Sequence, residues 1–68
     1  MTNFEKLCLC IIDTNGTPRE DHVKACGYGD ESYQRIISGE LSPERLVKNA
    51  IRCLKERGIH VKRGGEIL

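Results

Sequence analysis

The side chains best suited to metal chemistry in this chain are histidine and cysteine. His22 and Cys26 lie four residues apart, a spacing that places two side chains on one face of a helix. Imidazole and thiolate are both zinc ligands, and Cys8 and Cys10 could complete a set of four. Residues two apart on a helix point to different sides, however, and the chain contains no C-x-x-C pair. We therefore predict no metal site and no cofactor.

The four cysteines occupy apolar positions. Cys8 and Cys10 lie in the run Leu7–Ile12, Cys26 precedes a glycine, and Cys53 follows an apolar helical pattern. Free cysteine in such places behaves as a small hydrophobe. Because no secretion signal is visible, we expect reduced, buried thiols, with disulfides or metal ligation as the alternatives.

Arrangements typical of catalysis are not visible in the sequence. No Ser, His and Asp set or Cys and His pair is recognisable, and we expect His22 to be a half-buried packing residue. Neither Gly27–Gly29 nor Gly64–Gly65 follows a strand and opens a helix, as a phosphate-binding loop does. We expect no enzymatic activity and no small-molecule substrate.

Polar side chains that can read DNA bases gather in residues 30–38. Arg35 can form two hydrogen bonds with a guanine, Gln34 can pair with an adenine edge, and Glu31 can accept from a cytosine amine. The apolar residues of the same segment follow helical spacing and are expected to face inward. They are Tyr33, Ile36 and Ile37. The outward set is Glu31, Ser32, Gln34, Arg35 and Ser38.

Capping residues and glycines delimit the helices that must position this segment. Thr2 and Glu5 have the capping-box pattern, which predicts a helix from about Asn3 to a stop at 13–16. Its apolar stripe is Phe4, Leu7, Cys8 and Ile11.

The next two helices are short. The segment Thr17–Glu20 repeats the capping pattern, with Pro18 at the first helical position, and Gly27 has the position of a left-handed C-terminal residue. Asp30 is a plausible N-cap for the third helix, which should end at Gly39.

A longer fourth helix is expected from Ser42-Pro43 to Gly58. Its apolar stripe is Leu46, Val47, Ala50, Ile51, Cys53 and Leu54. The sequence therefore predicts an all-α, four-helix domain over residues 1–58. Residues 59–68 form a short C-terminal extension, for which a hairpin, a single β-strand and a frayed tail all remain open.

Over roughly residues 3–54, this pattern resembles the lambda-repressor-like family of helix-turn-helix regulators, the group of phage repressors and Cro proteins. The matching positions are Gly16, Arg19, Gly27, Ile36, Gly39 and Pro43–Leu54. The resemblance implies a four-helix helix-turn-helix fold. It also implies a small transcription regulator, a repressor of phage or another mobile element, that occupies a DNA operator as a homodimer.

Several further residues are expected to contact double-stranded DNA around the third helix, which is the expected recognition helix. Arg19, at the start of the second helix, can meet a phosphate, and Arg45 and Lys48 can add phosphate contacts. The complete predicted DNA-binding set is Arg19, Asp30, Glu31, Ser32, Gln34, Arg35, Ser38, Arg45 and Lys48.

Charge is distributed unevenly along the chain. Residues 1–34 hold three basic and six acidic residues, a balance of −3, whereas residues 35–68 hold eight basic and four acidic ones, a balance of +4. A basic half suits a polyanionic partner, although a solvated helix face is the plain alternative. Asp30 and Glu31 oppose phosphate binding. The alternative function is therefore a protein-interaction or inhibitor module whose acidic face comprises Glu20, Asp21, Asp30 and Glu31.

Length limits the remaining possibilities. A chain of 68 residues makes one domain that buries about 60% of its unfolded surface, so dimerisation would add stability. The extension 59–68 or the end of the fourth helix is the expected dimer surface. No apolar run of membrane-spanning length and no signal-peptide pattern is present, which predicts a soluble protein in the cytoplasm of a bacterial or phage-infected cell, without membrane contact.

Overall fold

The computed structural model describes residues 1–37 and 42–62, and the secondary structure in these ranges is helical. The all-α class predicted from the sequence is therefore confirmed for the described residues. The helices are α1 (Asn3–Asp13), α2 (Glu20–Ala25), α3 (Asp30–Ile37) and α4 (Pro43–Glu56). Of the C-terminal extension, only residues 59–62 are described, and Val61 there makes an isolated β-bridge.

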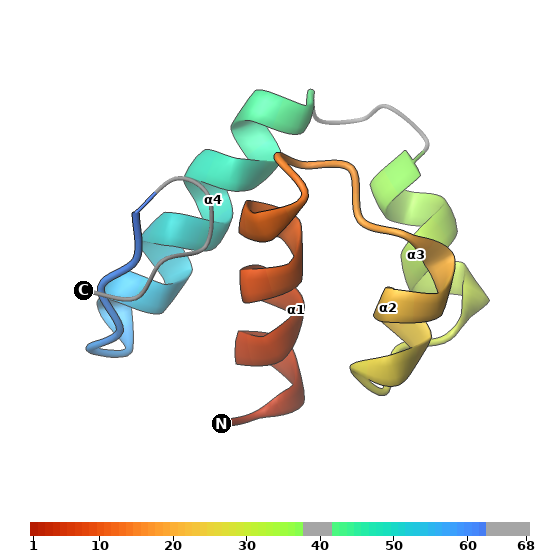
Figure 1. Ribbon diagram of the computed structural model, residues 1–68, viewed down its shortest axis with the longest axis horizontal. Helices are drawn as coiled ribbons and strands as arrows, with labels where there is room; N and C mark the ends of the chain where they lie inside the picture. Colours follow the sequence, from red (N-terminus) through yellow and green to blue (C-terminus); the bar gives the residue numbers. More distant parts are fainter. Residues whose placement is uncertain (38–41, 63–68) are drawn as a thin grey trace.

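Helix α1 stands in the middle of the molecule, with α4 on one side and the α2–α3 pair on the other (Figure 1). The most extensive helix contact joins α1 to α4, while α2 packs on α3 and more lightly on α1. The position of α3 is therefore set mainly through α2.

The buried core is built around α1, which packs against α4 on one side and α2 on the other. Ile12, Val23 and Leu54, one residue from each helix, have no exposed surface. Val61 is also buried, so the start of the C-terminal extension packs on the helical core. The complete buried set is Leu7, Cys8, Ile11, Ile12, Val23, Val47, Ala50, Leu54 and Val61.

The first helix begins with the capping box that the sequence predicts. The Glu5 N–H donates to Thr2 Oγ1 at 3.2 Å, and the Thr2 N–H donates to Glu5 Oε1 at 2.8 Å. Phe4 was expected in the apolar stripe, but this is wrong, because its side chain is exposed and the Arg57 guanidinium lies 4.7 Å from its ring centre. Phe4 precedes the first buried residue of α1 by almost one turn.

A Schellman motif ends α1. The Gly16 N–H donates to the Ile11 carbonyl at 2.8 Å, and the Asn15 N–H donates to the Ile12 carbonyl at 3.1 Å, so Asn15 takes the left-handed position with φ 55°. Gly16 also has a positive φ, 84°. A β-carbon at Gly16 would collide with the backbone of Pro43, so the loop after α1 lies directly against the start of α4.

The capping box predicted at Thr17–Glu20 does not form. Helix α2 begins at Glu20 with Arg19 as its N-cap, and no side chain caps it. The Thr17 hydroxyl instead donates to the Thr14 carbonyl at 2.6 Å, so the turn after α1 uses the group that the cap would need. Pro18 consequently lies before the helix, where it is buried.

Candidate nucleic-acid interface

The turn between α2 and α3 is built around Gly27. The Gly27 N–H donates to the Lys24 carbonyl at 2.9 Å, and the Tyr28 N–H donates to the Val23 carbonyl at 3.2 Å. These two bonds form another Schellman motif, with Gly27 at φ 90°, which confirms the predicted turn glycine. A β-carbon here would come within 2.7 Å of Asn3 Nδ2, so the turn also approaches the start of α1.

Lys24 links the end of α2 to the beginning of α3. Its Nζ lies 3.0 Å from Asp30 Oδ1 and 3.4 Å from Glu20 Oε1. The hydrogen bond with Asp30, followed by the charges of Asp30 and Glu20, raises the pKa of Lys24 above its usual value. The three side chains are about half to two-thirds exposed, so salt weakens this link.

Asp30 is not the N-cap of α3 that the sequence led us to expect. Helix α3 begins at Asp30 itself, the side chain is exposed, and its carboxylate pairs with Lys24. A carboxylate in the first turn of a helix is favoured by the helix dipole. The structure therefore places the Asp30 charge at the surface beside a compensating ammonium group.

Helix α3 separates polar and apolar side chains as predicted for the residues that are described. Glu31, Gln34 and Arg35 are exposed, whereas Tyr33 is half-buried and packs against the core. The predicted contact residue Ser38 lies outside the described residues. The side-chain positions of Ser32, Ile36 and Ile37 also fall outside the described part.

Arg19 lies at the entrance to α2. Its backbone occupies the N-cap position, and its Nε lies 3.5 Å from Asp21 Oδ1, with both side chains mostly exposed. An exposed pair of this kind is weak. A phosphate could therefore replace the Asp21 carboxylate as the partner of Arg19.

The two predicted DNA contacts on α4 lie apart from those on α2 and α3. Arg45 and Lys48 are exposed, and Lys48 Nζ lies 3.8 Å from Glu44 Oε1. Within the described ranges, α4 packs on α1 and makes no comparable contact with α3. The structure thus brings the α2 and α3 candidates together, while Arg45 and Lys48 come from a helix beyond α1.

An open groove of about 400 Å³ lies between parts of α1 and α2. His22 is exposed beside it, so its predicted half-burial is wrong, because the inward face of the short α2 is taken by Val23. Across residues 1–37 and 42–62, no three His, Cys, Asp or Glu side chains are grouped so that they could hold a metal ion. The groove is lined by Lys6, Leu9, Cys10, Asp13, His22, Ala25 and Cys26.

The cysteines are free thiols, but only one of them is fully buried as predicted. Cys8 is buried, whereas Cys10, Cys26 and Cys53 are half-buried. Burial raises the pKa of the Cys8 thiol to about 11, with a smaller contribution from Cys53. Burial, followed by the charge of Cys26, also raises the pKa of Cys10. Raised pKa values disfavour the nucleophilic thiolate.

No protein-family model, curated protein or solved structure matches the chain. None of the described helices combines the length and the apolar character required to cross a membrane.

Proposed function

We propose that this protein is a small, sequence-specific DNA-binding transcription regulator with a lambda-repressor-like helix-turn-helix. In this proposal α2 braces α3, and α3 enters the major groove of double-stranded DNA. One observation carries the proposal: Glu31, Gln34 and Arg35 are exposed on a helix that follows a tight turn from α2. Burial of Val23 in α2 anchors this pair of helices to the core.

The exposed side chains supply hydrogen bonds of the kinds that distinguish base pairs. Arg35 would bind a guanine through two donors, Gln34 would pair with an adenine, and Glu31 would accept from a cytosine amine. Arg19 would hold a phosphate at the entrance to α2, and phosphate contacts of this type position a protein without reading sequence. Repression would follow from occupying a promoter.

The Lys24 link supports this function because it offsets the charge of Asp30. An uncompensated carboxylate beside the DNA backbone opposes the release of counterions that drives binding. Lys24 Nζ lies 3.0 Å from the Asp30 carboxylate but also 3.4 Å from Glu20 Oε1, so it offsets part of the Asp30 charge near a phosphate. Glu31 remains available for a base contact.

We further propose that the protein acts as a homodimer. Two-fold symmetry would place two copies of α3 in major grooves about 34–36 Å apart, on half-sites separated by one helical turn. The C-terminal extension is the proposed dimer surface, and a chain of this length gains stability from such an interface.

A selection of bound sequences from random duplex DNA tests the proposal. The expected result is a short recurring motif with two-fold symmetry. Arg35→Ala should then cost about 1–3 kcal/mol on that motif and relax the preference at one base pair. Lys6→Ala is the control, because Lys6 is an exposed lysine of α1 outside the proposed interface. Equal binding by wild type and Arg35→Ala would show that α3 does not read DNA.

A protein-interaction or inhibitor module is the second candidate function. The observation in its favour is that the carboxylates of α2 and α3 are all exposed and could form an acidic face. These are Glu20, Asp21, Asp30 and Glu31. A salt titration separates the two candidates, because DNA affinity should fall steeply as salt rises. Absence of affinity for a random duplex at low salt would favour the interaction module.

A further inference from the structure

The outer face of α4 carries a straight line of cations. They follow one another at intervals of three, four and three residues, which aligns side chains on one face of a helix. All are exposed, and the opposite face of α4 is buried against α1. We call this line the α4 basic stripe; it consists of Arg45, Lys48, Arg52 and Lys55.

Carboxylates compensate little of this charge. Lys48 pairs with Glu44 at 3.8 Å, which is a long contact between two mostly exposed side chains. Among residues 1–37 and 42–62, no ion pair is formed by Arg52 or Lys55. On α2 and the start of α3, by contrast, Lys24 and Arg19 pair with three carboxylates. Among the described residues, the positive charge on α4 is therefore less compensated than that on α2 and the start of α3.

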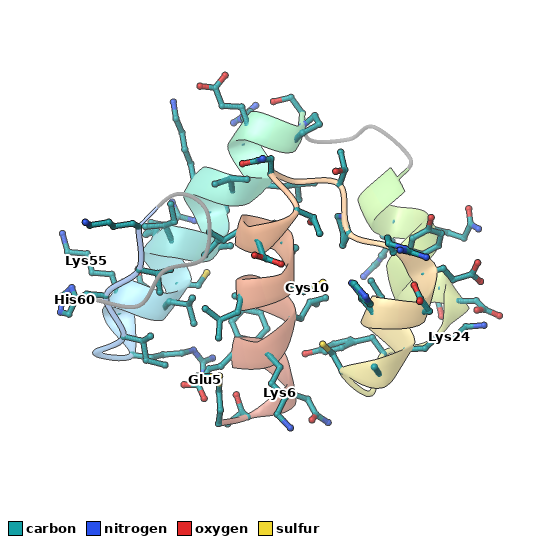
Figure 2. All side chains as sticks on the ribbon, in the orientation of Figure 1. Glu5, Lys6, Cys10, Lys24, Lys55 and His60 are labelled. Atoms are coloured by element: carbon teal, nitrogen blue, oxygen red, sulfur yellow. The ribbon has the colours of Figure 1, made fainter. Side chains whose placement is uncertain are left out.

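The C-terminal end of the stripe, marked by Lys55, lies on the outer side of the molecule, away from the α2–α3 pair (Figure 2). Figure 2 shows Lys55 and His60 projecting from the outer side of the molecule next to α4, whereas Lys24 projects from the opposite side. Helix α1 stands between these two sides (Figure 1). A duplex held by α3 would therefore leave Arg52 and Lys55 exposed.

The dimensions and chemistry of the stripe favour a phosphate backbone. At 1.5 Å per residue, the stripe is about 15 Å long, and duplex DNA presents one negative charge for about every 1.7 Å of its axis. Insertion into a lipid surface requires an exposed apolar face, but the buried residues of α4 are packed into the core. A row of cations carried by one regular helix suits the dense charge of DNA.

We propose that the α4 basic stripe is a second, sequence-independent binding surface for the phosphate backbone of duplex DNA. This surface acts independently of base reading by α3. A single molecule can then hold one duplex segment on α3 and touch another segment through α4. The sequence also predicts Arg45 and Lys48 as phosphate contacts of the α3-bound duplex. Substitutions at Arg52 and Lys55 therefore test the new surface separately.

The test measures binding of the full chain to a random duplex of about 20 base pairs by fluorescence anisotropy, at about 50–300 mM salt. For Arg52→Ala/Lys55→Ala, the slope of log K against log salt should fall by about two, and affinity at the lowest salt should fall about tenfold. The charge-preserving variant Arg52→Lys/Lys55→Arg should behave as wild type. Lys6→Ala controls for loss of an exposed lysine elsewhere, and circular dichroism checks folding.

Arg35→Ala distinguishes this proposal from base reading by α3. It should reduce preference for a selected motif while leaving the salt slope on random duplex nearly unchanged. An unchanged slope in Arg52→Ala/Lys55→Ala, or no binding of wild type to the random duplex, would overturn the second surface. Binding to vesicles with about one-third anionic lipid is measured for the same proteins. If Arg52→Ala/Lys55→Ala lost vesicle binding but kept duplex binding, the stripe would be a membrane surface, and the proposed DNA surface would be overturned.

Discussion

Lys24 Nζ lies 3.0 Å from Asp30 Oδ1, and this contact joins α2 to the first residue of α3. The two residues are separated by the Gly27 turn, so the pair spans the connection that sets the direction of α3. It also offsets a carboxylate on the surface that we propose to face DNA. The contact thus acts on both the geometry and the charge of the interface.

Replacing Lys24 with methionine should weaken DNA binding. Lys24→Met leaves the Asp30 carboxylate uncompensated near the phosphates, and we expect about a threefold to tenfold loss of affinity at low salt that shrinks as salt screens the charge. Lys6→Met is the matched control. Because the hydrogen bond with Asp30 raises the pKa of Lys24 above its usual value, the pair should be present at neutral pH. On the alkaline side it should be lost as the pH rises past that raised pKa. Equal losses in both variants would remove any special role for Lys24.

Replacing Gly16 with alanine should destabilise the fold more than the same change at Gly58 or Gly29. Gly16→Ala combines a positive φ with a collision against the Pro43 backbone, for an expected loss of about 2–4 kcal/mol in the free energy of unfolding. Gly58→Ala has a positive φ but open space, so about 1–2 kcal/mol is expected.

Gly29→Ala is the control for these changes. Nothing lies near a β-carbon at Gly29 and its φ is not positive, so the change should be below about 1 kcal/mol. Urea unfolding of the three variants measures their free energies of unfolding and so tests the expected order of destabilisation. A Gly16→Ala protein as stable as Gly29→Ala would contradict the close contact with Pro43.

The capping box of α1 should make stability depend on pH in the acid range. Hydrogen bonding from the Thr2 backbone N–H lowers the pKa of Glu5 below 4.5. A carboxyl with a lowered folded-state pKa stabilises the protein above its unfolded pKa, and that contribution disappears as pH falls through the lowered value. Thermal unfolding is measured between pH 3 and 7. The unfolding temperature should therefore fall less on acidification in Glu5→Gln than in wild type. Identical pH profiles would show that Glu5 contributes nothing.

The buried thiol of Cys8 should resist alkylation in the folded protein. With a pKa of about 11, only about one thiol in a thousand is ionised at pH 8, and burial also excludes the reagent. Iodoacetamide labelling followed by peptide mass analysis should leave Cys8 unmodified, whereas urea should make all four cysteines reactive. Rapid labelling of Cys8 without denaturant would argue against its place in the core.

Helix ends were the most predictable part of the fold, because local hydrogen bonds determine them. Thr2 with Glu5, Gly27 and Gly58 all occupy the cap positions expected from residue type and spacing. Thr17 shows the limit of this reasoning. The Thr17 hydroxyl could accept from the backbone N–H of Glu20, as in a capping box, or donate to the preceding turn. The structure shows the second arrangement, with the Thr14 carbonyl as the acceptor.

Burial and ion pairing across elements were less predictable. Helical periodicity suggested an inward position for Phe4, and His22 was expected to be half-buried, but both are exposed. Burial depends on how neighbouring helices pack, and on α2 the inward position is taken by Val23. The exposed positions of Gln34 and Arg35 on α3 agreed with the pattern. The pairing of Lys24 with Asp30 was missed because the two residues are six apart, and only the fold of the turn brings them together.

The contact between Gly16 and Pro43 ties two distant parts of the sequence at one point. Helix α1 packs mainly on α4, and the loop that leads into α2 rests on the first residue of α4. An isolated peptide of residues 17–37 would contain α2 and α3 but would lack α1 and α4, which support and orient this pair of helices. DNA recognition by such a fragment should be lost even though every proposed base-reading side chain would still be present.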